Sequence, residues 1–419
     1  MERGNGGHTA KKRLTEAPDE ARAQGVMPIR PWRWPDCQSL AVGSPLMRES
    51  CEMSGCARWR ALVAIVFTVA LITTCGPGFN GSPPAGGTVR VAPGADHACI
   101  VPGGSNPPIA WTKLRNPILS YPNAGVKDQA LLWARGYWHM VFSYVTNDTT
   151  VPGQEHWDIA TSESRDLLRW SAPVPWSEQP GGVVSPDVVR SPTGLFVATY
   201  DSPPGESGAT QAKLYYRTSG NLVHWSSPHL LAPTLHASKA YRLIDPALAW
   251  TGNGLILAYK VGVTSAPQAF EIAWSKSGSL SGPWVVVGRP AIRQYGDTFE
   301  NYELVSVGDR WHLVATSNTL DQPWIYTLVG DPKTPSSWLH WTDGRQLQIP
   351  GEAWNTGTGI SSVNYEHANS AFLCMDTADG YAYLTYAGSR ELSEFGGWGH
   401  AEIGVARSKD LVHWSVPPG

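Results

Sequence analysis

Four acidic residues recur at near-constant intervals in this 419-residue chain. They are Asp128, Asp187, Asp245 and Glu300, separated by 59, 58 and 55 residues. Each acid lies at the start of a short run of apolar residues that are typical of β-strands. One carboxylate at the same place in each repeat predicts a closed ring of sheets, which brings the acids to a shared axis.

A second repeated feature is a polar turn that ends in a tryptophan. Five such turns end at Trp170, Trp225, Trp284, Trp341 and Trp414. The segments between them are short, aromatic and β-branched, and are separated by Gly, Asp, Asn or Pro. Each repeat supplies about four strands, the size of one propeller blade. The sequence therefore predicts an all-β, five-bladed β-propeller over residues 108–419. Two β-sandwiches are the alternative, against which the equal intervals argue.

The first 57 residues differ from the rest of the chain. They are rich in charged residues, Gly and Pro and show no sustained apolar period, which predicts a disordered extension. The alternative is that translation starts at Met47 or Met53, so that the residues before that start are absent from the natural protein.

An apolar run from Ala61 to Ile72 follows two arginines and ends in Thr-Thr-Cys75. It is too short for a comfortable membrane span and predicts a signal peptide over residues 58–75, so that the protein is exported. Cys75 resembles the lipidated cysteine of a bacterial lipoprotein, which would attach the protein to a membrane. An uncleaved anchor or ordinary cleavage nearby are the alternatives. Residues 76–107 are Gly/Pro-rich and predict a linker.

Two cysteines, Cys99 and Cys374, remain after Cys75. In an oxidising compartment, two cysteines suggest one disulfide. Cys99 precedes the first repeat and Cys374 lies in the last, and a ring brings its first and last blades side by side. This predicts a disulfide that closes the ring, with two buried free thiols as the alternative.

Composition excludes one class of partner. The net charge is −3 and only 16% of the residues are charged, so no basic field indicates nucleic-acid binding. The 20 tryptophans can fill the space between blades or stack on sugar rings, and packing is the expected role for most of them.

The segments Lys-Asp128-Gln-Ala-Leu-Leu, Ser-Pro-Asp187-Val-Val, Ile-Asp245-Pro-Ala and Phe-Glu300-Asn-Tyr resemble, in their order and spacing, the propeller glycosidases of glycoside hydrolase family 43 and the related family 62. The Ser-x-Asp-Leu-x-x-Trp turns at Asp166 and Asp410 add to the resemblance, which covers about 300 residues. The chain departs from the family pattern where Gln replaces the Pro after Asp128 and where Asn-Tyr follows Glu300.

This resemblance implies that Asp128 is the general base, that Asp245 orients the acid and tunes its pKa, and that Glu300 is the general acid. Inversion needs an acid and a base roughly 6.5–9.5 Å apart, and blades on different sides of an axial pocket can supply that separation. We expect Asp245 to raise the pKa of Glu300 by like-charge repulsion, and the surroundings of Asp128 to be more polar.

Three further residues are candidates for the site. Glu303 is a local rival to Glu300, and Asp187 is expected to support the site or the axis rather than to catalyse. His367 occupies the fifth blade's version of the acid position, and the resemblance implies a structural calcium ion near it on the axis. A hydrogen-bonded core or surface histidine is the alternative. No other cofactor is required, and no Cys/His pattern suggests zinc.

The favoured function is an exported or lipid-anchored, monomeric, inverting glycosidase that acts on arabinose- or xylose-containing polysaccharide or oligosaccharide. The nearest enzyme alternative, a sialidase propeller, is disfavoured because the turns lack its glycine. A non-catalytic glycan-binding propeller or a structural surface protein would also fit the pattern of strands. The retention of all three expected carboxylates favours the enzyme over both.

Overall fold

We describe a computed structural model over residues 109–147, 155–176, 182–202, 212–238, 242–263, 266–290, 292, 299–317, 322–342, 344–355, 367–375, 379–389 and 401–418. The chain divides into a unit Met1–Phe79 and a unit Asn80–Gly419, and all the described residues belong to the second. The expected signal segment, the linker, Cys75 and Cys99 lie outside them. Within the described residues, no helix has the length and apolar character to cross a membrane.

Five antiparallel sheets follow one another along the second unit, which confirms the predicted five-bladed propeller. Blade 1 and blade 2 each pair their strands in chain order. Their strands are β1 (Ala124–Ala134), β2 (Tyr137–Asn147), β3 (Glu155–Ser164), β4 (Val174–Pro175), β5 (Val184–Arg190), β6 (Phe196–Asp201), β7 (Leu214–Ser219) and β8 (His229–Leu230).

The remaining three blades repeat this order, and the last has three strands of its own. Their strands are β9 (Arg242–Trp250), β10 (Leu255–Val263), β11 (Ala266–Ser275), β12 (Val285–Gly288), β13 (Phe299–Val307), β14 (Arg310–Ser317), β15 (Gln322–Thr327), β16 (Arg345–Gln346), β17 (Asn369–Met375), β18 (Ala382–Gly388) and β19 (Glu402–Ser408). The described helices are short: α1 (Pro233–Ser238), η1 (Trp111–Lys113) and η2 (Pro335–Leu339).

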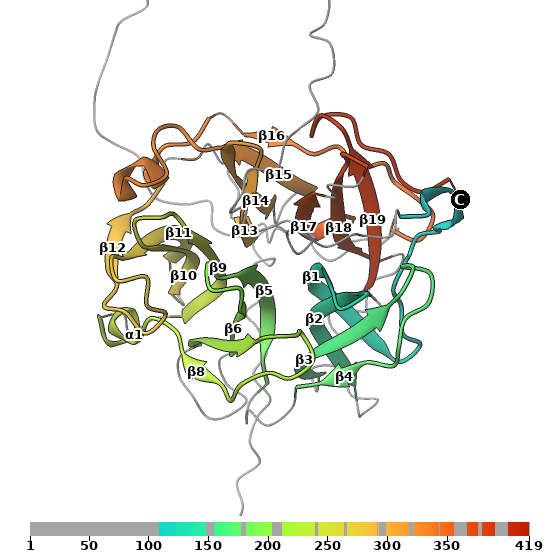
Figure 1. Ribbon diagram of the computed structural model, residues 1–419, viewed down its shortest axis with the longest axis horizontal. Helices are drawn as coiled ribbons and strands as arrows, with labels where there is room; N and C mark the ends of the chain where they lie inside the picture. Colours follow the sequence, from blue (N-terminus) through green and yellow to red (C-terminus); the bar gives the residue numbers. More distant parts are fainter. Residues whose placement is uncertain are drawn as a thin grey trace, which may run out of the picture. The chain divides into compact units, whose positions relative to one another are not determined.

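The first strand of each blade lies innermost. Each contacts its neighbours in the cyclic order β1, β5, β9, β13, β17 and back to β1. Figure 1 shows these five strands around the centre, with the outer strands of each blade towards the rim. Residues near the start of every inner strand can therefore face one axial space, although the strands are far apart in sequence.

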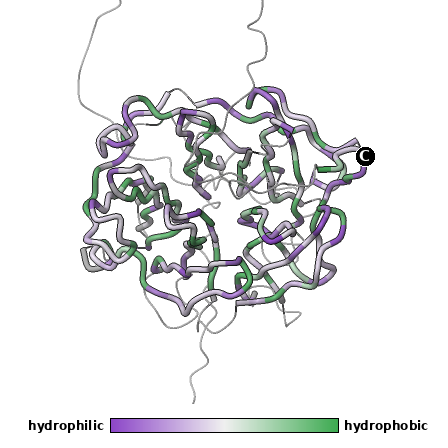
Figure 2. Tube along the Cα trace, viewed as in Figure 1, coloured by the Kyte–Doolittle hydropathy of each residue, from purple (hydrophilic) through white to green (hydrophobic). Residues whose placement is uncertain are grey.

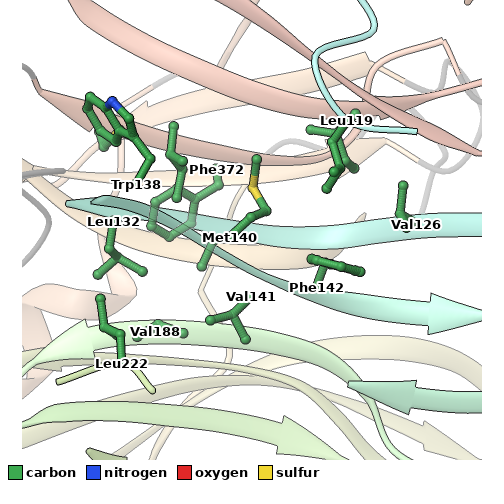
Figure 3. Close-up of a cluster of buried hydrophobic side chains, with 14 of the residues drawn as sticks. Leu119, Val126, Leu132, Trp138, Met140, Val141, Phe142, Val188, Leu222 and Phe372 are labelled. Carbon is green, nitrogen blue, oxygen red and sulfur yellow. The ribbon is translucent and has the colours of Figure 1, made fainter. Parts of the chain in front are cut away.

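Apolar side chains between the blades hold the ring together. The largest cluster joins blades 1, 2 and 5 and includes Met140, Val188 and Phe372, all less than a tenth exposed (Figure 3). Along the chain, hydrophobic stretches lie within the blades, while paler and more hydrophilic stretches make up much of the rim (Figure 2). The inner strand β1 is buried along its whole length, as this packing on both faces of a blade requires.

The repeated tryptophan turns connect the third strand of a blade to its outer edge. In blade 1, the Ser164 hydroxyl accepts a hydrogen bond from the Leu167 amide, and Asp166 accepts from the next two amides. These bonds hold Leu167 at a φ of 64° and bury its side chain, and Trp170 then bridges back to Ser164. Blades 2 and 5 use the same hydrogen bonds at Asn221 and Asp410.

The segment before β1 closes the ring on the last blade. Leu119 pairs with Ile403 of β19, where it acts as an additional edge for the three-stranded sheet. Asn116 binds both backbone groups of Val405: its Nδ2 donates to the carbonyl at 3.0 Å and its Oδ1 accepts from the amide at 2.9 Å. Residues nearly 300 positions apart thus share one sheet edge, which removes an open edge from the propeller.

Candidate active site

Each inner strand carries a β-bulge at the axis. The register with the second strand shifts by one residue in all five blades, and the first bulge residue has a positive φ of 51° to 54°. These residues are Asp128, Ser185, Asp245, Asn301 and Ser370. Short polar side chains tolerate this left-handed conformation better than bulky ones. Strained residues concentrated at one point on the axis are typical of a functional site.

The register corrects the expectation that the four repeated acids are equivalent. Asp128 and Asp245 do occupy the same position, the first bulge residue, but Glu300 lies one residue before its bulge. Asp187 and Glu303 are equivalent to each other and follow their bulges. Intervals of 55 to 59 residues conceal these shifts because loop lengths differ between blades, and only strand pairing reveals which residues face alike.

A cavity opens between the five bulges, and every blade contributes to its wall. It is lined by Asp128, Gln129, Ser185, Pro186, Asp187, Asp245, Pro246, Asn301, Tyr302, Glu303, Ser370, Ala371 and Phe372. Four of the predicted site acids thus line one space. Glu300 is not among the lining residues, but it directly precedes Asn301, which is, and Lys260 joins its carboxylate to that of the lining residue Asp245. The structure therefore brings together Asp128, Asp245 and Glu300.

Asp128 is buried and accepts three side-chain hydrogen bonds. Asn301 and Ser370 donate to Oδ1 at 2.7 and 2.6 Å, and Ser143 donates to Oδ2 at 2.7 Å. The Lys127 ammonium lies 3.8 Å from Oδ1. This is the polar environment expected for the residue. A carboxylate oxygen can accept two hydrogen bonds, so Oδ2, which accepts one from Ser143, has the capacity to accept another.

Glu300 and Asp245 share one cation, Lys260. Its Nζ lies 3.3 Å from Glu300 Oε2 and 3.8 Å from Asp245 Oδ2, and its side chain is 3% exposed. The Glu300 carboxylate is the most open of the three groups, with a side chain 19% exposed, and also accepts a bond from Asn369. The sequence predicts like-charge repulsion between Asp245 and Glu300, and the structure adds a buried cation in contact with both, which the sequence did not indicate.

The acids around Asp245 interact electrostatically. Burial raises the pKa of Asp245, Lys260 opposes this rise, and the carboxylates of Glu300 and Asp128 add to it. Burial and the neighbouring Asp245 also raise the pKa of Asp201 well above its ordinary value. Asp201 Oδ1 accepts a hydrogen bond from the Asp245 amide at 3.1 Å, so this acid supports the backbone of the bulge.

Asp187 and Glu303, which occupy equivalent positions in blades 2 and 4, are both buried and interact electrostatically. Burial raises the pKa of Asp187 to about 7 and raises the pKa of Glu303 well above its usual range, with Asp187 adding to the latter rise. Each carboxylate accepts a hydrogen bond from a backbone amide of the next blade, Leu248 for Asp187 and Leu373 for Glu303. Glu303 is 2% exposed, so the partly open Glu300 is the better placed of the two rival glutamates.

His367 lies two residues before β17 and does not occupy the fifth blade's version of the acid position. Strand pairing gives that position to Asn369 and Ser370. The His367 Nδ1 is 3.0 Å from the Asn355 carbonyl oxygen. Within the part of the chain that the structure describes, no group of three or more His, Cys, Asp or Glu residues is arranged to hold a metal ion. A calcium ion near His367 stays a prediction.

Cys374 is 1% exposed in β17 and takes part in a disulfide. It packs in the same cluster as residues of blade 1, including Leu131. Because Cys99 lies outside the described residues, its pairing with Cys374 stays a prediction, as does the lipidation of Cys75.

Sequence patterns did not identify five neighbours of the acids: Ser143, Asp201, Lys260, Asn301 and Ser370. One signal could have found two of them. Ser143 and Lys260 each lie 15 residues after the first-bulge acid of their own blade, where the second strand returns to the bulge. Ser370 required knowledge of which blades are adjacent, and Asn301 required knowledge of which bulges face each other across the axis.

Solved structures with a similar fold are glycoside hydrolases. A glycosyl hydrolase from Bacteroides ovatus covers 78% of this chain and 99% of its own, with a TM-score of 0.52 and 13% identity. A further match is a family-62 α-L-arabinofuranosidase from Coprinopsis cinerea, which aligns over 69% of this chain and 94% of its own with a TM-score of 0.49 and 12% sequence identity. Another is a thermostable family-43 glycoside hydrolase, which aligns over 72% of this chain and 96% of its own with a TM-score of 0.47 and 12% sequence identity.

The chain shares the five-bladed fold of the Bacteroides ovatus glycosyl hydrolase. At this identity the likeness concerns the fold alone. No family model and no curated protein matches the sequence. The activity must therefore be argued from the carboxylates at the axis.

Proposed function

We propose that this protein is a glycoside hydrolase in which Glu300 is the general acid and Asp128 the general base. One observation carries the proposal: the two carboxylates come from blades 4 and 1 and meet through one adjacent pair of residues. Asn369 donates to Glu300, and Ser370, the next residue, donates to Asp128. Glycoside hydrolysis needs one carboxyl group as acid and a second as base, and this link supports the pairing of Glu300 with Asp128 in those two roles.

In the proposed reaction, Glu300 gives a proton to the glycosidic oxygen as the bond to the anomeric carbon breaks. Asp128 takes a proton from a water molecule at Oδ2, and that water attacks the opposite face of the sugar. The product has the inverted anomeric configuration, and the spacing expected between the carboxyl groups is roughly 6.5–9.5 Å. Asn301, Ser143 and Ser370 hold Asp128 through three hydrogen bonds, which fixes its orientation towards the water.

The proposed substrate is an arabinose- or xylose-containing polysaccharide or oligosaccharide. Support comes from the sequence resemblance to families 43 and 62. The proposed location is outside the cell or in the cell envelope, through the signal segment over residues 58–75 and a lipid on Cys75. No cofactor takes part in the proposed reaction, and a monomer is sufficient because one chain contributes all the named groups.

The test is hydrolysis of aryl arabinofuranosides, aryl xylosides, arabinans and xylans by the full-length protein. Release of sugar is expected from at least one member of this panel. Asp128→Asn keeps the shape of the side chain but removes the base, and a loss of about 10²–10⁴-fold in kcat is expected. Proton NMR of the first-formed product should show the inverted anomer.

Glycan binding without release of sugar from any substrate would overturn the proposal and favour a glycan-binding propeller. Retention of the starting configuration would reject inversion while leaving hydrolysis intact. An Asp128→Asn variant with wild-type turnover would reject that residue as the base.

A further inference from the structure

Lys260 is a buried cation at a position where the other blades carry a different kind of side chain. The equivalent position lies on the second strand, opposite the residue that precedes the bulge. In three other blades, the side chain at this position accepts a hydrogen bond. The donor is the backbone amide of the first bulge residue in the next blade. These acceptor–donor pairs are Ser143 with Ser185, Asp201 with Asp245, and Thr316 with Ser370, at 2.9, 3.1 and 2.9 Å.

An ammonium group has no acceptor, so Lys260 cannot make this blade-to-blade bond. It extends instead to the carboxylates of Asp245 in its own blade and Glu300 in the next. Burying an ammonium is costly unless it is paired. A residue that gives up a structural hydrogen bond and carries that cost is expected to serve the site rather than the scaffold.

We propose that Lys260 is a positioning residue that holds Glu300 beside Asp245 and must release Glu300 before this carboxyl group can take up a proton. The inference rests on the proposed function of Glu300 as general acid, and it adds a cation that sets when the acid is ready. Lys260 then remains paired with Asp245, which is the more deeply buried of the two carboxylates.

The charges account for this exchange. Asp245, Lys260 and Glu300 together carry a net charge of −1 when all three are ionised. One proton from solvent on Glu300 brings the cluster to neutrality and leaves a single ion pair in the interior. Burial by itself favours the proton on Asp245, and the contact with Lys260 opposes this. We assign the proton to Glu300 because its side chain is 19% exposed, against 7% for Asp245, and can take up a proton from solvent while Lys260 stays paired with Asp245. The proton on Glu300 is the one that the leaving oxygen then receives.

Other groups around the cluster do not replace Lys260. The further charged or titratable groups that act on Asp245 are Asp128 from β1, Arg242 from its own strand and Asp201 from β6, whose own pKa is raised well above its ordinary value by burial and by Asp245. Tyr302 of β13 is buried, and its pKa is raised well above the ordinary value by burial and by Asp245 and Glu300, so it stays neutral. Asn369 of β17 contributes an uncharged amide. Lys260 is the cation in direct contact with both acids among the contacts described for the cluster.

The first experiment follows the carboxyl ¹³C signals of glutamate-labelled full-length protein against pH, with the Glu300 signal assigned from its loss in Glu300→Gln. In Lys260→Met the Glu300 midpoint is expected to move up by about one pH unit or more, because a cation in contact with a carboxylate favours its ionised form. Lys260→Arg should keep the midpoint near that of wild type. Lys276→Met removes an exposed lysine with the same change in net charge and should also leave it in place.

An unchanged Glu300 midpoint in Lys260→Met would overturn the proposal. Should that variant not fold, the wild-type protein still decides. The ¹⁵N chemical shift of Lys260 Nζ must then change with pH at the same midpoint as the carboxyl signal of Glu300. Separate midpoints would reject the exchange. Neither readout requires activity, so a protein that hydrolyses nothing would reject the proposed function without deciding the role of Lys260.

The second experiment measures kcat/KM against pH on whichever substrate is hydrolysed. In Lys260→Met, the fall of kcat/KM on the alkaline side of the pH profile should move to higher pH. In Lys260→Arg, that fall should return to the wild-type pH. A purely structural role would lower the rate at every pH and leave the fall at the wild-type pH, and that result would count against the proposal.

Discussion

Asn301 donates a 2.7 Å hydrogen bond to Asp128, a residue 173 positions earlier in the chain, and it directly follows Glu300. The backbone of one strand therefore connects the proposed acid to the proposed base across the axis. Any movement of the blade 4 bulge would change the position of both groups together. Because blades 1 and 4 are not neighbours in the ring, this link makes the geometry of the site depend on how the ring closes around its axis.

Removing that link should reduce activity without unfolding the protein. Asn301→Gly deletes the side chain and keeps a residue suited to the φ of 51° at this position. A hydrogen bond to a charged group is worth about 1.5–3 kcal/mol, so a fall of roughly tenfold to a hundredfold in kcat/KM is expected. Steady-state kinetics beside a thermal melt would check this, and wild-type kinetics would contradict it.

Glu300→Gln and Glu303→Gln should behave differently towards the leaving group. A general acid matters most when the leaving group is poor, so Glu300→Gln should lose about 10²–10⁴-fold on alkyl glycosides and polysaccharides and much less on dinitrophenyl glycosides. Glu303 is buried and bonded to the Leu373 amide, so its variant should show no such dependence. Rates on the two substrate types would decide between these glutamates, and the reverse pattern would assign the acid to Glu303.

Asp187→Asn should change how stability depends on pH. Folded Asp187 keeps its proton up to a pKa of about 7, whereas the unfolded carboxyl group loses it near 3.8. The unfolded state binds fewer protons between these values, so Asp187 lowers the free energy of unfolding as pH rises through this window. The variant should match wild type below pH 4 and be more stable by at most about 4 kcal/mol above pH 7.

Urea melts at pH 4 and pH 7.5 would measure this difference. Asp309→Asn, in an exposed turn, serves as the control. A constant difference between Asp187→Asn and wild type at both pH values would refute the assignment of a buried, protonated Asp187.

Asn116→Ala should weaken the closure of the ring. The substitution removes both hydrogen bonds to Val405, a residue in the core, and each unsatisfied buried backbone group costs about 1–3 kcal/mol. A lower Tm is expected in calorimetry. Asn253→Ala removes a single side-chain bond at an exposed position and should change the Tm little. Equal melting points for the two variants would show that Asn116 does not contribute to closure.

The predicted disulfide has a direct test. Intact mass of the exported protein after alkylation, with and without reductant, should show two protected thiols, and a tryptic map should contain the peptide pair of Cys99 and Cys374. Detection of two alkylated free thiols in the non-reduced sample would end the idea.

The sequence by itself determined the five-bladed fold, because repeats of β-forming residues, tryptophan turns and buried strands are local patterns that survive in any arrangement of the blades. It also pointed to Asp128, Asp245 and Glu300. It could not give the register of the bulges, since a shift of one residue leaves the spacing almost unchanged while changing which side chain faces the axis. The placement of Asn301, Ser370 and Lys260 against the acids was decided only by the tertiary structure, because these contacts form between blades and depend on the closure of the ring.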